Sequence, residues 1–160
     1  MDVFEAIRGR RSVRKYLDKE VPWDYIVSII QAAKYAPCAG NIMNWKFLVL
    51  KNEGNRKAVA KACVGQEWME SAPIIIVVVA EPMKAERYYG SRGARLYTIQ
   101  GAAASIQNML LMAHDLGLAT CWVGAFDEDE IWRICKMSEE TSVQAVITLG
   151  YAAETPNMPP

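Results

Sequence analysis

The sequence predicts one globular domain in which helices and strands alternate, and three observations carry this prediction. The chain has 160 residues, 52% hydrophobic and 22% charged, which suits a single domain, residues 1–160, with a substantial core. Residues 74–79 are β-branched without alternation, as expected of a central strand buried on both faces. From Leu96 onward, apolar residues recur at helical spacing. Alternation alone favours a layered α/β sheet.

The N-terminal elements follow from capping and proline signals. Residues 3–9 are predicted to be helical, because Asp2 and Glu5 have the spacing of a capping box and Gly9 is a suitable stop. A second helix should begin at Pro22 and end near residue 35, since Pro37 biases the preceding residue out of the helix. The proline, glycine and two asparagines of the next eight residues indicate a loop.

The remaining elements are predicted from periodicity and composition. Strands are expected over residues 45–51, 118–123 and 143–151, and helices over residues 55–63, 66–71 and 127–137. The helix that starts near Leu96 is apolar on all its faces, which indicates burial nearly all round. In so small a chain, this suggests that a partner subunit covers part of it. The tail from Thr155 to Pro160 has no core signal.

Charge and residue usage narrow the function classes. Basic and acidic residues both number 18, so net charge gives no reason to expect a nucleic acid or a membrane surface as partner. The longest uncharged run is interrupted by polar residues, and the N-terminus lacks the apolar stretch of a secretory signal. We therefore predict a cytoplasmic protein without a membrane span. The four cysteines form no C-x2-C pair, so we expect them to be free and mostly buried thiols. With His114 as the single histidine, the sequence does not favour a metal cluster or a Cys/His nucleophile.

A cluster of cations marks the exit of the first helix. Five of eight residues are basic: Arg8, Arg10, Arg11, Arg14 and Lys15. Next to Ser12, their guanidinium groups suit a bidentate grip on a phosphate. A solvated charged turn explains the cluster equally well, and a nucleic-acid contact is a third reading. The glycine patterns of nucleoside triphosphate and Rossmann dinucleotide sites do not occur.

Two further segments carry polar groups without a clear acid/base pair. Asn41 and Asn44, with Cys38, offer uncharged donors and acceptors that suit the rim of a planar heterocycle, although turn chemistry alone explains asparagines in a loop. Arg92 and Arg95, between the central strand and the long helix, would suit the 2′-phosphate of NADPH, but a solvated loop explains them as well.

Taken together, several segments resemble the nitroreductase family of flavoproteins. They occur in the family's order over nearly the whole chain, and the ordered set is more specific than any one segment. The matching sequences are RRSVR from residue 10, APCAGNIMNW from residue 36, APIIIVV from residue 72, IQNML from residue 106, GLATCWVGAF from residue 117 and ITLGY from residue 147.

The resemblance implies a fold and an assembly. It implies an α+β fold with a mainly antiparallel central sheet flanked by helices, in place of the layered α/β arrangement that alternation suggests. It also implies a homodimer packed through long helices, including the one from Leu96, with FMN at the interface. A flavin there would account for both the apolar helix and the local cations.

The resemblance also implies which residues contact FMN. Arg10, Arg11, Ser12 and Arg14 of one subunit would hold the phosphate, the ribityl chain and the pyrimidine edge. Four residues of the other subunit would line the isoalloxazine: Pro37, Cys38, Ala39 and Asn41. Gly124 and Ala125 would place backbone groups beside the reactive N5, where small residues permit close approach. No side chain is implied as a catalytic acid, base or nucleophile.

The implied reaction passes a hydride from NADH or NADPH through FMN to an acceptor such as a nitroaromatic or a quinone, so that the cofactor carries the difficult chemistry. A different reaction on the same fold, such as dehalogenation or dehydrogenation, and a flavin-binding protein without turnover are the alternatives. Three positions depart from the family pattern. Cys38 stands where serine is common, Met43-Asn44 replaces a common Gln-Pro, and no basic residues follow Gly150, where relatives use them to help bind phosphate.

Overall fold

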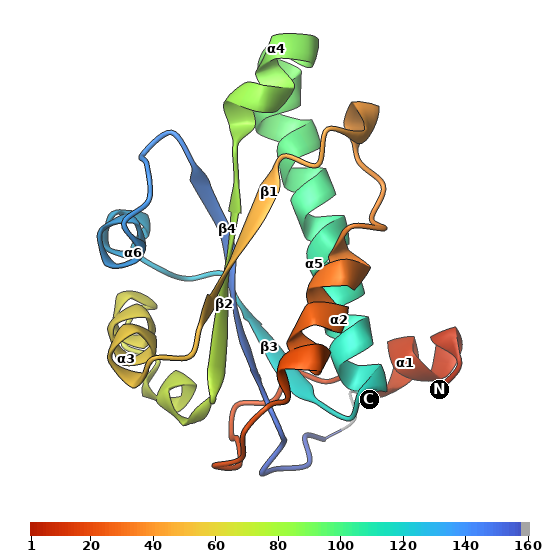
Figure 1. Ribbon diagram of the computed structural model, residues 1–160, viewed down its shortest axis with the longest axis vertical. Coiled ribbons are helices and arrows are strands. Elements are labelled where there is room, and N and C mark those ends of the chain that lie inside the picture. The colour runs from red at the N-terminus through yellow and green to blue at the C-terminus, as the bar shows by residue number, and fades with distance from the viewer. Residues whose placement is uncertain (158–160) are drawn as a thin grey trace.

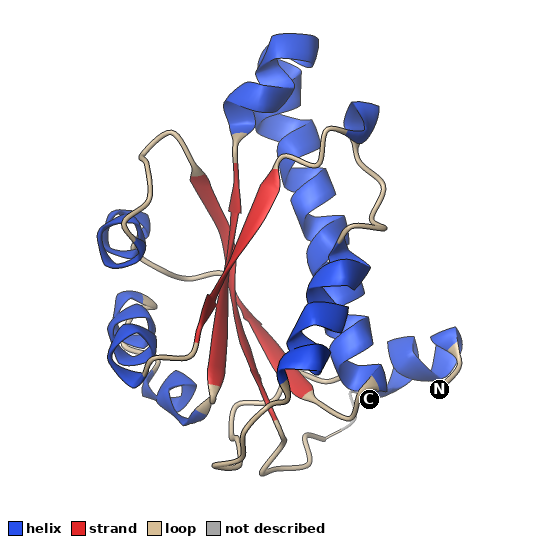
Figure 2. Cartoon of the chain, viewed as in Figure 1, coloured by secondary structure: helices blue, strands red, loops and turns tan. Residues whose placement is uncertain are grey.

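The computed structural model describes residues 1–157 as a sheet between two helical layers (Figures 1 and 2). Residues 158–160 of the predicted tail lie outside the described residues. One face of the sheet carries α3 (Glu53–Ala62) and α6 (Glu128–Cys135), and the other carries α2 (Trp23–Ala33) and α5 (Thr98–Asp115). Helix α1 (Val3–Gly9) packs near the end of α5, and α4 (Pro82–Arg92) lies at its start.

The sheet is antiparallel throughout. Within residues 1–157 its strands are β1 (Trp45–Leu50), β2 (Ile74–Ala80), β3 (Ala119–Val123) and β4 (Ser142–Gly150), in the order β1-β2-β4-β3. This confirms the antiparallel α+β architecture implied by the resemblance and corrects the layered α/β expectation from alternation. All seven residues of β2 are buried, because β2 lies inside the sheet with a helical layer on each face.

Local capping signals predict the helix ends well. The Asp2 side chain accepts a hydrogen bond from the Glu5 amide at 2.8 Å, and Glu5 accepts from the Asp2 amide at 3.0 Å, which completes the predicted capping box. Asp127 caps α6 through the Glu130 amide at 3.1 Å. Helix α1 ends at Gly9, and Arg10 then turns into extended backbone.

Two sequence predictions about helices need correction. Residues 66–71 were expected to be helical and form a 3-10 helix, η2 (Glu67–Ser71). Arg92 and Arg95 do not lie in a loop. Arg92 ends α4, and Arg95 lies in a π-helical turn, η3 (Gly93–Tyr97), that leads directly into α5. The two glycines near this junction hide the helical pattern from a sequence reading.

Helix α5 buries one stripe against the sheet in the single chain. The buried positions include Gly101, Ser105, Ile106 and Met109, whereas Ile99 is 53% exposed. Burial nearly all round is therefore not a property of one chain, and cover by a partner subunit stays a prediction.

Candidate functional site

The arginine-bearing segment runs extended beside the start of β3. Arg10 caps α1 through its amide, which donates to Ala6 at 3.1 Å. Ser12 then forms an isolated parallel bridge with Thr120, and the Val13 amide donates to the Thr120 carbonyl at 3.0 Å. These contacts add a short strand-like piece to the sheet edge. They fix the backbone direction at the residues predicted to hold a phosphate.

The other side of this segment is held by residues that follow β4. The Leu17 amide donates to Tyr151 at 2.9 Å, and the Ala153 amide donates to Lys15 at 2.8 Å. The Arg14 amide donates to a carboxylate oxygen of Glu154 at 2.6 Å. The segment is therefore clamped between β3 and the chain after β4, which sequence reasoning did not show.

Buried Tyr16 connects the arginine-bearing segment to β4. Its hydroxyl donates to the Val13 carbonyl at 2.7 Å and shares a hydrogen bond of 2.7 Å with the Thr148 hydroxyl of β4. Burial raises the pKa of Tyr16 well above its usual value, so the phenol is neutral over the physiological range. Tyr16 is thus a structural support of the candidate site and not an acid or base in it.

Two of the five cations lie at one cavity of about 480 Å³. Arg10 and Arg11 line it together with Thr120, His114 and Glu154. The Arg11 guanidinium donates to the carbonyls of Arg8 at 2.6 Å and Arg10 at 2.7 Å, which orients it across the helix exit. A guanidinium pair in a hollow is a donor set that fits a phosphate.

Arg14 points elsewhere. Its guanidinium carbon lies 6.0 Å from the centroid of the Trp68 ring, so the side chain leans over η2. Arg14 is exposed and does not line the cavity of Arg10 and Arg11. The geometry therefore separates Arg14 from Arg10 and Arg11, and the contact of Arg14 with the cofactor stays a prediction.

The four cysteines are free thiols, and two of them, Cys63 and Cys121, are buried. Cys121 lies beneath the arginine-bearing segment. Burial raises the pKa of its thiol, while Arg14 and the Ser12 hydroxyl act in the opposite direction. The thiol is therefore held neutral, like a small apolar side chain.

The loop after α2 has an irregular backbone. Gly40, Asn41 and Met43 all have positive φ, and η1 (Ala39–Asn41) forms its only turn of helix within the described chain. The Met43 amide donates to the Cys38 sulfur at 3.4 Å. Pro37 and Asn41 are exposed, while Cys38 and Ala39 are half-buried. This loop presents uncharged backbone and small side chains, which fit the rim of a planar ring.

Asn44 does not belong to that rim. It is buried, and its amide nitrogen donates to the Glu81 carbonyl at 3.1 Å and to the Thr98 hydroxyl at 2.9 Å. Thr98 in turn donates to Gly93 at 2.9 Å. The asparagine joins the loop to the end of β2 and the start of α5, so the expectation of a cofactor-facing Asn44 is corrected.

Gly124 and Ala125 follow β3 and are both exposed. A Cβ placed on Gly124 would meet nothing within 4 Å, so the space beside its backbone is open. This fits a backbone that a bound ring approaches closely.

The two predicted groups of FMN contacts lie at opposite ends of α5. At one end, a Cβ on Gly101 would lie 3.2 Å from the Cβ of Cys38. At the other end, a Cβ on Gly9 would lie 2.6 Å from the His114 ring. Thirteen residues of helix separate Gly101 from His114, a span of roughly 20 Å. One chain therefore does not bring the groups together, and a site built from both needs a second copy.

Glu154 is the cavity residue that the sequence did not reveal. It places a carboxylate in the same hollow as Arg10 and Arg11, and it accepts from an amide 140 residues away in the sequence. No local pattern signals such a contact.

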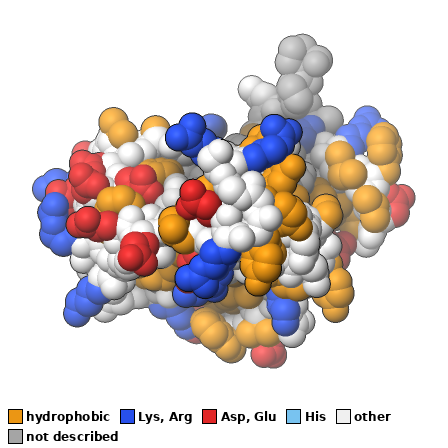
Figure 3. All heavy atoms as spheres, turned by 90° about the horizontal axis from the view of Figure 1, so that it is seen from above, with side chains coloured by type: hydrophobic (Ala, Val, Ile, Leu, Met, Phe, Trp, Pro, Cys, Tyr) orange, Lys and Arg blue, Asp and Glu red, His pale blue; other side chains and the backbone are white. Residues whose placement is uncertain are grey.

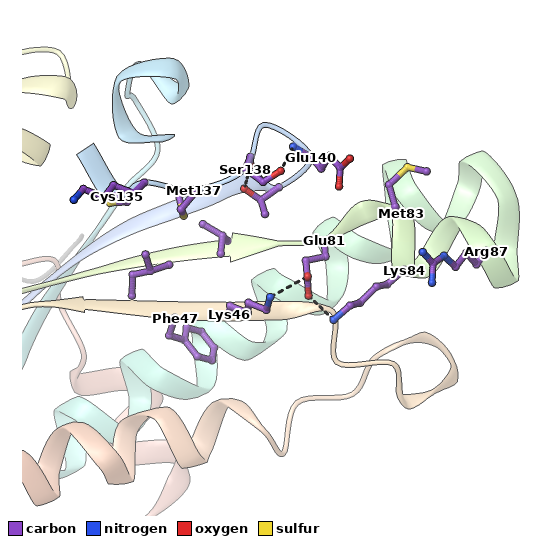
Figure 4. Close-up of a pocket in the computed structure, with 14 residues that line it drawn as sticks. Lys46, Phe47, Glu81, Met83, Lys84, Arg87, Cys135, Met137, Ser138 and Glu140 are labelled. Carbon is purple, nitrogen blue, oxygen red and sulfur yellow. Dashed lines mark hydrogen bonds and ion pairs between the residues drawn. The ribbon is translucent and has the colours of Figure 1, made fainter. Parts of the chain in front are cut away.

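A second cavity, of about 530 Å³, lies where β1 begins and β2 ends (Figure 4), and no residue of the arginine segment lines it. Glu81 accepts ion pairs there from Lys46 at 3.0 Å and from Lys84 at 2.5 Å. These pairs lower the pKa of Glu81, the Lys84 contact most. The two lysines thus balance the charge of the Glu81 carboxylate. The cavity contains none of the predicted flavin contacts.

Two negative findings apply to residues 1–157. No group of three or more His, Cys, Asp and Glu side chains is arranged to hold a metal ion. None of the helices formed by these residues is long and apolar enough to cross a bilayer.

Comparison with known proteins identifies the family of the chain. The family model "Nitroreductase family" matches residues 7–66 and 56–151. A protein of Methanothermobacter thermautotrophicus named "Putative NADH dehydrogenase/NAD(P)H nitroreductase" is 34% identical over 98% of this chain and 80% of its own length.

Solved structures of nitroreductases have the same fold. A nitroreductase family protein from Clostridium novyi NT superposes with a TM-score of 0.88 at 27% identity, over 96% of this chain and 87% of that one. An FMN-dependent nitroreductase from Clostridium difficile R20291 has a TM-score of 0.85 at 25% identity, over 99% and 92% of the two chains. Family model, relatives and fold coincide, and the chain belongs to the nitroreductase family.

Proposed function

We propose that this chain is an FMN-dependent oxidoreductase that passes a hydride from NADH or NADPH through FMN to an acceptor such as a nitroaromatic or a quinone. One observation carries the proposal: Arg10 and Arg11 line a single cavity at the clamped helix exit, beside Ser12. Family membership and the FMN-dependent enzyme among the similar structures support it.

In this proposal, residues of two copies of the chain hold each cofactor. Arg10 and Arg11 bind the phosphate, Ser12 the ribityl chain, and Arg14 the pyrimidine edge of FMN. Pro37, Cys38, Ala39 and Asn41 of the second copy line the ring, and Gly124 and Ala125 approach it with their backbone. When bound, FMN supplies the hydride acceptor and donor, so the protein needs no acid, base or nucleophile of its own.

The electrostatic part of the task falls to Arg14. A fixed guanidinium beside the pyrimidine edge favours added negative charge there, which raises the reduction potential of the bound cofactor. The clamp from Thr120, Glu154 and Tyr16 holds the backbone that carries Arg14, so this charge is positioned before the reaction.

A homodimer completes the site in this proposal. The two groups of contacts are about 20 Å apart along α5 in one chain, and large apolar side chains on α1, α2, α4 and α5 stay exposed, among them Phe4, Trp23, Tyr88 and Ile99. A second copy that packs on α1, α2 and α5 would bury Phe4, Trp23 and Ile99 and bring its own Cys38 loop to the arginines, while Tyr88 on α4 stays exposed. A cytoplasmic location, where NAD(P)H is available, belongs to the same proposal.

The experiment is a titration of the purified protein with FMN and with riboflavin, followed by visible absorption and anaerobic addition of NADH and NADPH. We expect tight FMN binding, weaker riboflavin binding and bleaching of the flavin bands by reduced nucleotide. Turnover with an added quinone would exclude a flavin-binding protein without activity.

Matched variants localise the phosphate. Arg10→Ala should lower FMN affinity at least about tenfold, roughly 1.4 kcal/mol, and leave riboflavin affinity unchanged. Arg133→Ala is the control, because Arg133 is an exposed arginine paired with Glu130 on α6. No FMN binding by the unchanged chain, or equal losses for FMN and riboflavin, would contradict the proposal.

A further inference from the structure

The segment from α4 to η3 is a cationic and aromatic projection on a chain whose net charge is zero. Between residues 82 and 97 it carries four cations and one carboxylate, Glu86, together with three tyrosines. Viewed from this end of the molecule, Lys and Arg side chains lie beside hydrophobic ones (Figure 3). Cations next to exposed aromatic rings are the groups that bind a nucleotide, through its phosphates and its base.

The projection lies against the loop that the proposed function places on the flavin ring. A Cβ on Gly40 would lie 2.5 Å from the Tyr89 hydroxyl, so α4 covers the turn between Cys38 and Asn41. Tyr89 packs edge-on against Tyr97, with ring centroids 5.4 Å apart. Helix α4 therefore borders the loop that is proposed to line the flavin ring.

Arg92 is held in a defined orientation on this projection. Its Nε donates to the Tyr97 hydroxyl at 3.1 Å, and its guanidinium carbon lies 5.5 Å from the centroid of the Tyr97 ring. Among residues 1–157, no hydrogen bond or ion pair engages its two terminal nitrogens. A guanidinium fixed through Nε and a stacking face presents those nitrogens as a fork for a phosphate.

Arg95 adds a second exposed guanidinium three residues further on, in the turn that joins α4 to α5. The backbone between α4 and α5 is irregular at this point. Gly90 has φ 59° and ψ −155°, and η3 is a π turn. Such irregularities concentrate at functional positions, because they re-aim side chains at a cost in stability.

The other two cations of the segment are accounted for. Lys84 pairs with Glu81, and both Lys84 and Arg87 line the cavity at the end of the sheet (Figure 4). Arg92 and Arg95 therefore remain as the two exposed arginines of the segment that are available to a ligand.

We infer that Arg92 and Arg95 bind the 2′-phosphate of NADPH, which makes NADPH the preferred electron donor of this enzyme. The inference rests on the proposed function. A 2′-phosphate is a monoester with close to two negative charges, and it sits on the adenosine end, away from the nicotinamide that must face the flavin. A peripheral, exposed arginine pair fits that end of the molecule. Tyr88, 74% exposed, offers a surface for the adenine.

The test compares both donors in the flavin-loaded enzyme and in the Arg92→Ala/Arg95→Ala variant. We expect the KM for NADPH to rise at least about tenfold, with kcat and the KM for NADH changed less than about twofold. Tyr97→Phe, which removes only the hydroxyl that holds Arg92, should raise the KM for NADPH about threefold. Arg133→Ala on α6 is the matched control and should leave both KM values unchanged.

A binding measurement that does not depend on turnover completes the test. Calorimetry with adenosine 2′,5′-bisphosphate and with AMP should show a preference for the bisphosphate in the unchanged protein, and this preference should disappear in the double variant. Equal increases of both KM values would assign the arginines to the pyrophosphate and overturn the inference, as would no change in either. If the enzyme oxidises neither donor, the proposed function fails, and the calorimetric preference alone decides this inference.

Discussion

The two helical layers of the molecule are built differently. In the α3 and α6 layer, both helices begin with a side-chain cap, from Asn52 and Asp127, and the helices close over a buried cluster around Val59 and Ile131. Its exposed large apolar residue in the described chain is Val64. The α2, α4 and α5 layer has no side-chain cap on these helices and leaves Trp23, Ile99 and several tyrosines exposed. One layer is complete in a single chain, and the other has surfaces that fit the proposed second copy.

The largest difference between the layers should appear when an exposed apolar residue of each layer is replaced by aspartate. Ile99→Asp puts a carboxylate on the apolar face of α5, where the proposed partner packs, and should abolish the dimer and lower FMN affinity about 100-fold, roughly 2.8 kcal/mol. Val64→Asp adds the same charge to an exposed apolar residue of the closed layer, where it should change neither. Sedimentation and flavin titration measure both. A dimeric Ile99→Asp protein with full flavin binding would show that α5 is not the interface.

A smaller effect should distinguish the asparagines of the two layers. Asn44→Ala leaves the Thr98 hydroxyl and the Glu81 carbonyl without their buried partner and should lower the free energy of unfolding by about 2 kcal/mol. Asn52→Ala removes only the exposed cap of α3, which accepts from the Asn55 amide at 3.1 Å, and should cost about 1 kcal/mol. Urea unfolding gives both values. Equal losses would mean that the Asn44 network contributes no more than a surface cap.

The free energy of unfolding should fall gradually at alkaline pH because of Cys63, which is buried under the α3 and α6 layer. Burial raises the pKa of Cys63 from 9.0 to about 12, so its neutral thiol favours the folded state. This contribution is complete below pH 9 and declines as the pH rises toward 12, because the unfolded chain releases its proton first, with a slope of at most about 1.4 kcal/mol per pH unit.

Unfolding measured from pH 8 to pH 11 in the wild type and in Cys63→Ala tests this prediction. The stability difference between them should shrink as pH rises. Val59→Ala, a buried neighbour without a titrating group, should instead keep a constant difference. A constant difference for Cys63→Ala too would remove the thiol as the source of the pH dependence.

Sequence reasoning succeeded where the signal is local. The capping box at Asp2, the side-chain cap from Asp127 and the β-branched run of β2 specify their own structure, because each depends on neighbours a few residues away. The family motifs then indicated the antiparallel topology. Alternation of helices and strands alone had favoured a layered α/β sheet, which was wrong.

The remaining features depend on distant contacts. Asn44 faces Thr98, 54 residues away, and Arg14 meets Glu154, 140 residues away. An asparagine in a loop has the same local sequence whether it is exposed to a ligand or buried as a brace. The sequence did not predict helix α4, because Gly90 and Gly93 interrupt the helical pattern. In the structure Gly93 permits close packing, since a Cβ built at this position would lie 2.5 Å from the Ala85 carbonyl oxygen.

The separation of the two contact groups along α5 has a consequence for how the cofactor is loaded. If half of each flavin site comes from a second copy, occupancy follows the concentration of protein as well as that of FMN, because mass action couples assembly to binding. Dilution would release flavin even at constant FMN, and FMN in turn would draw chains into pairs. The supply of active enzyme would then rise more steeply than the amount of polypeptide made.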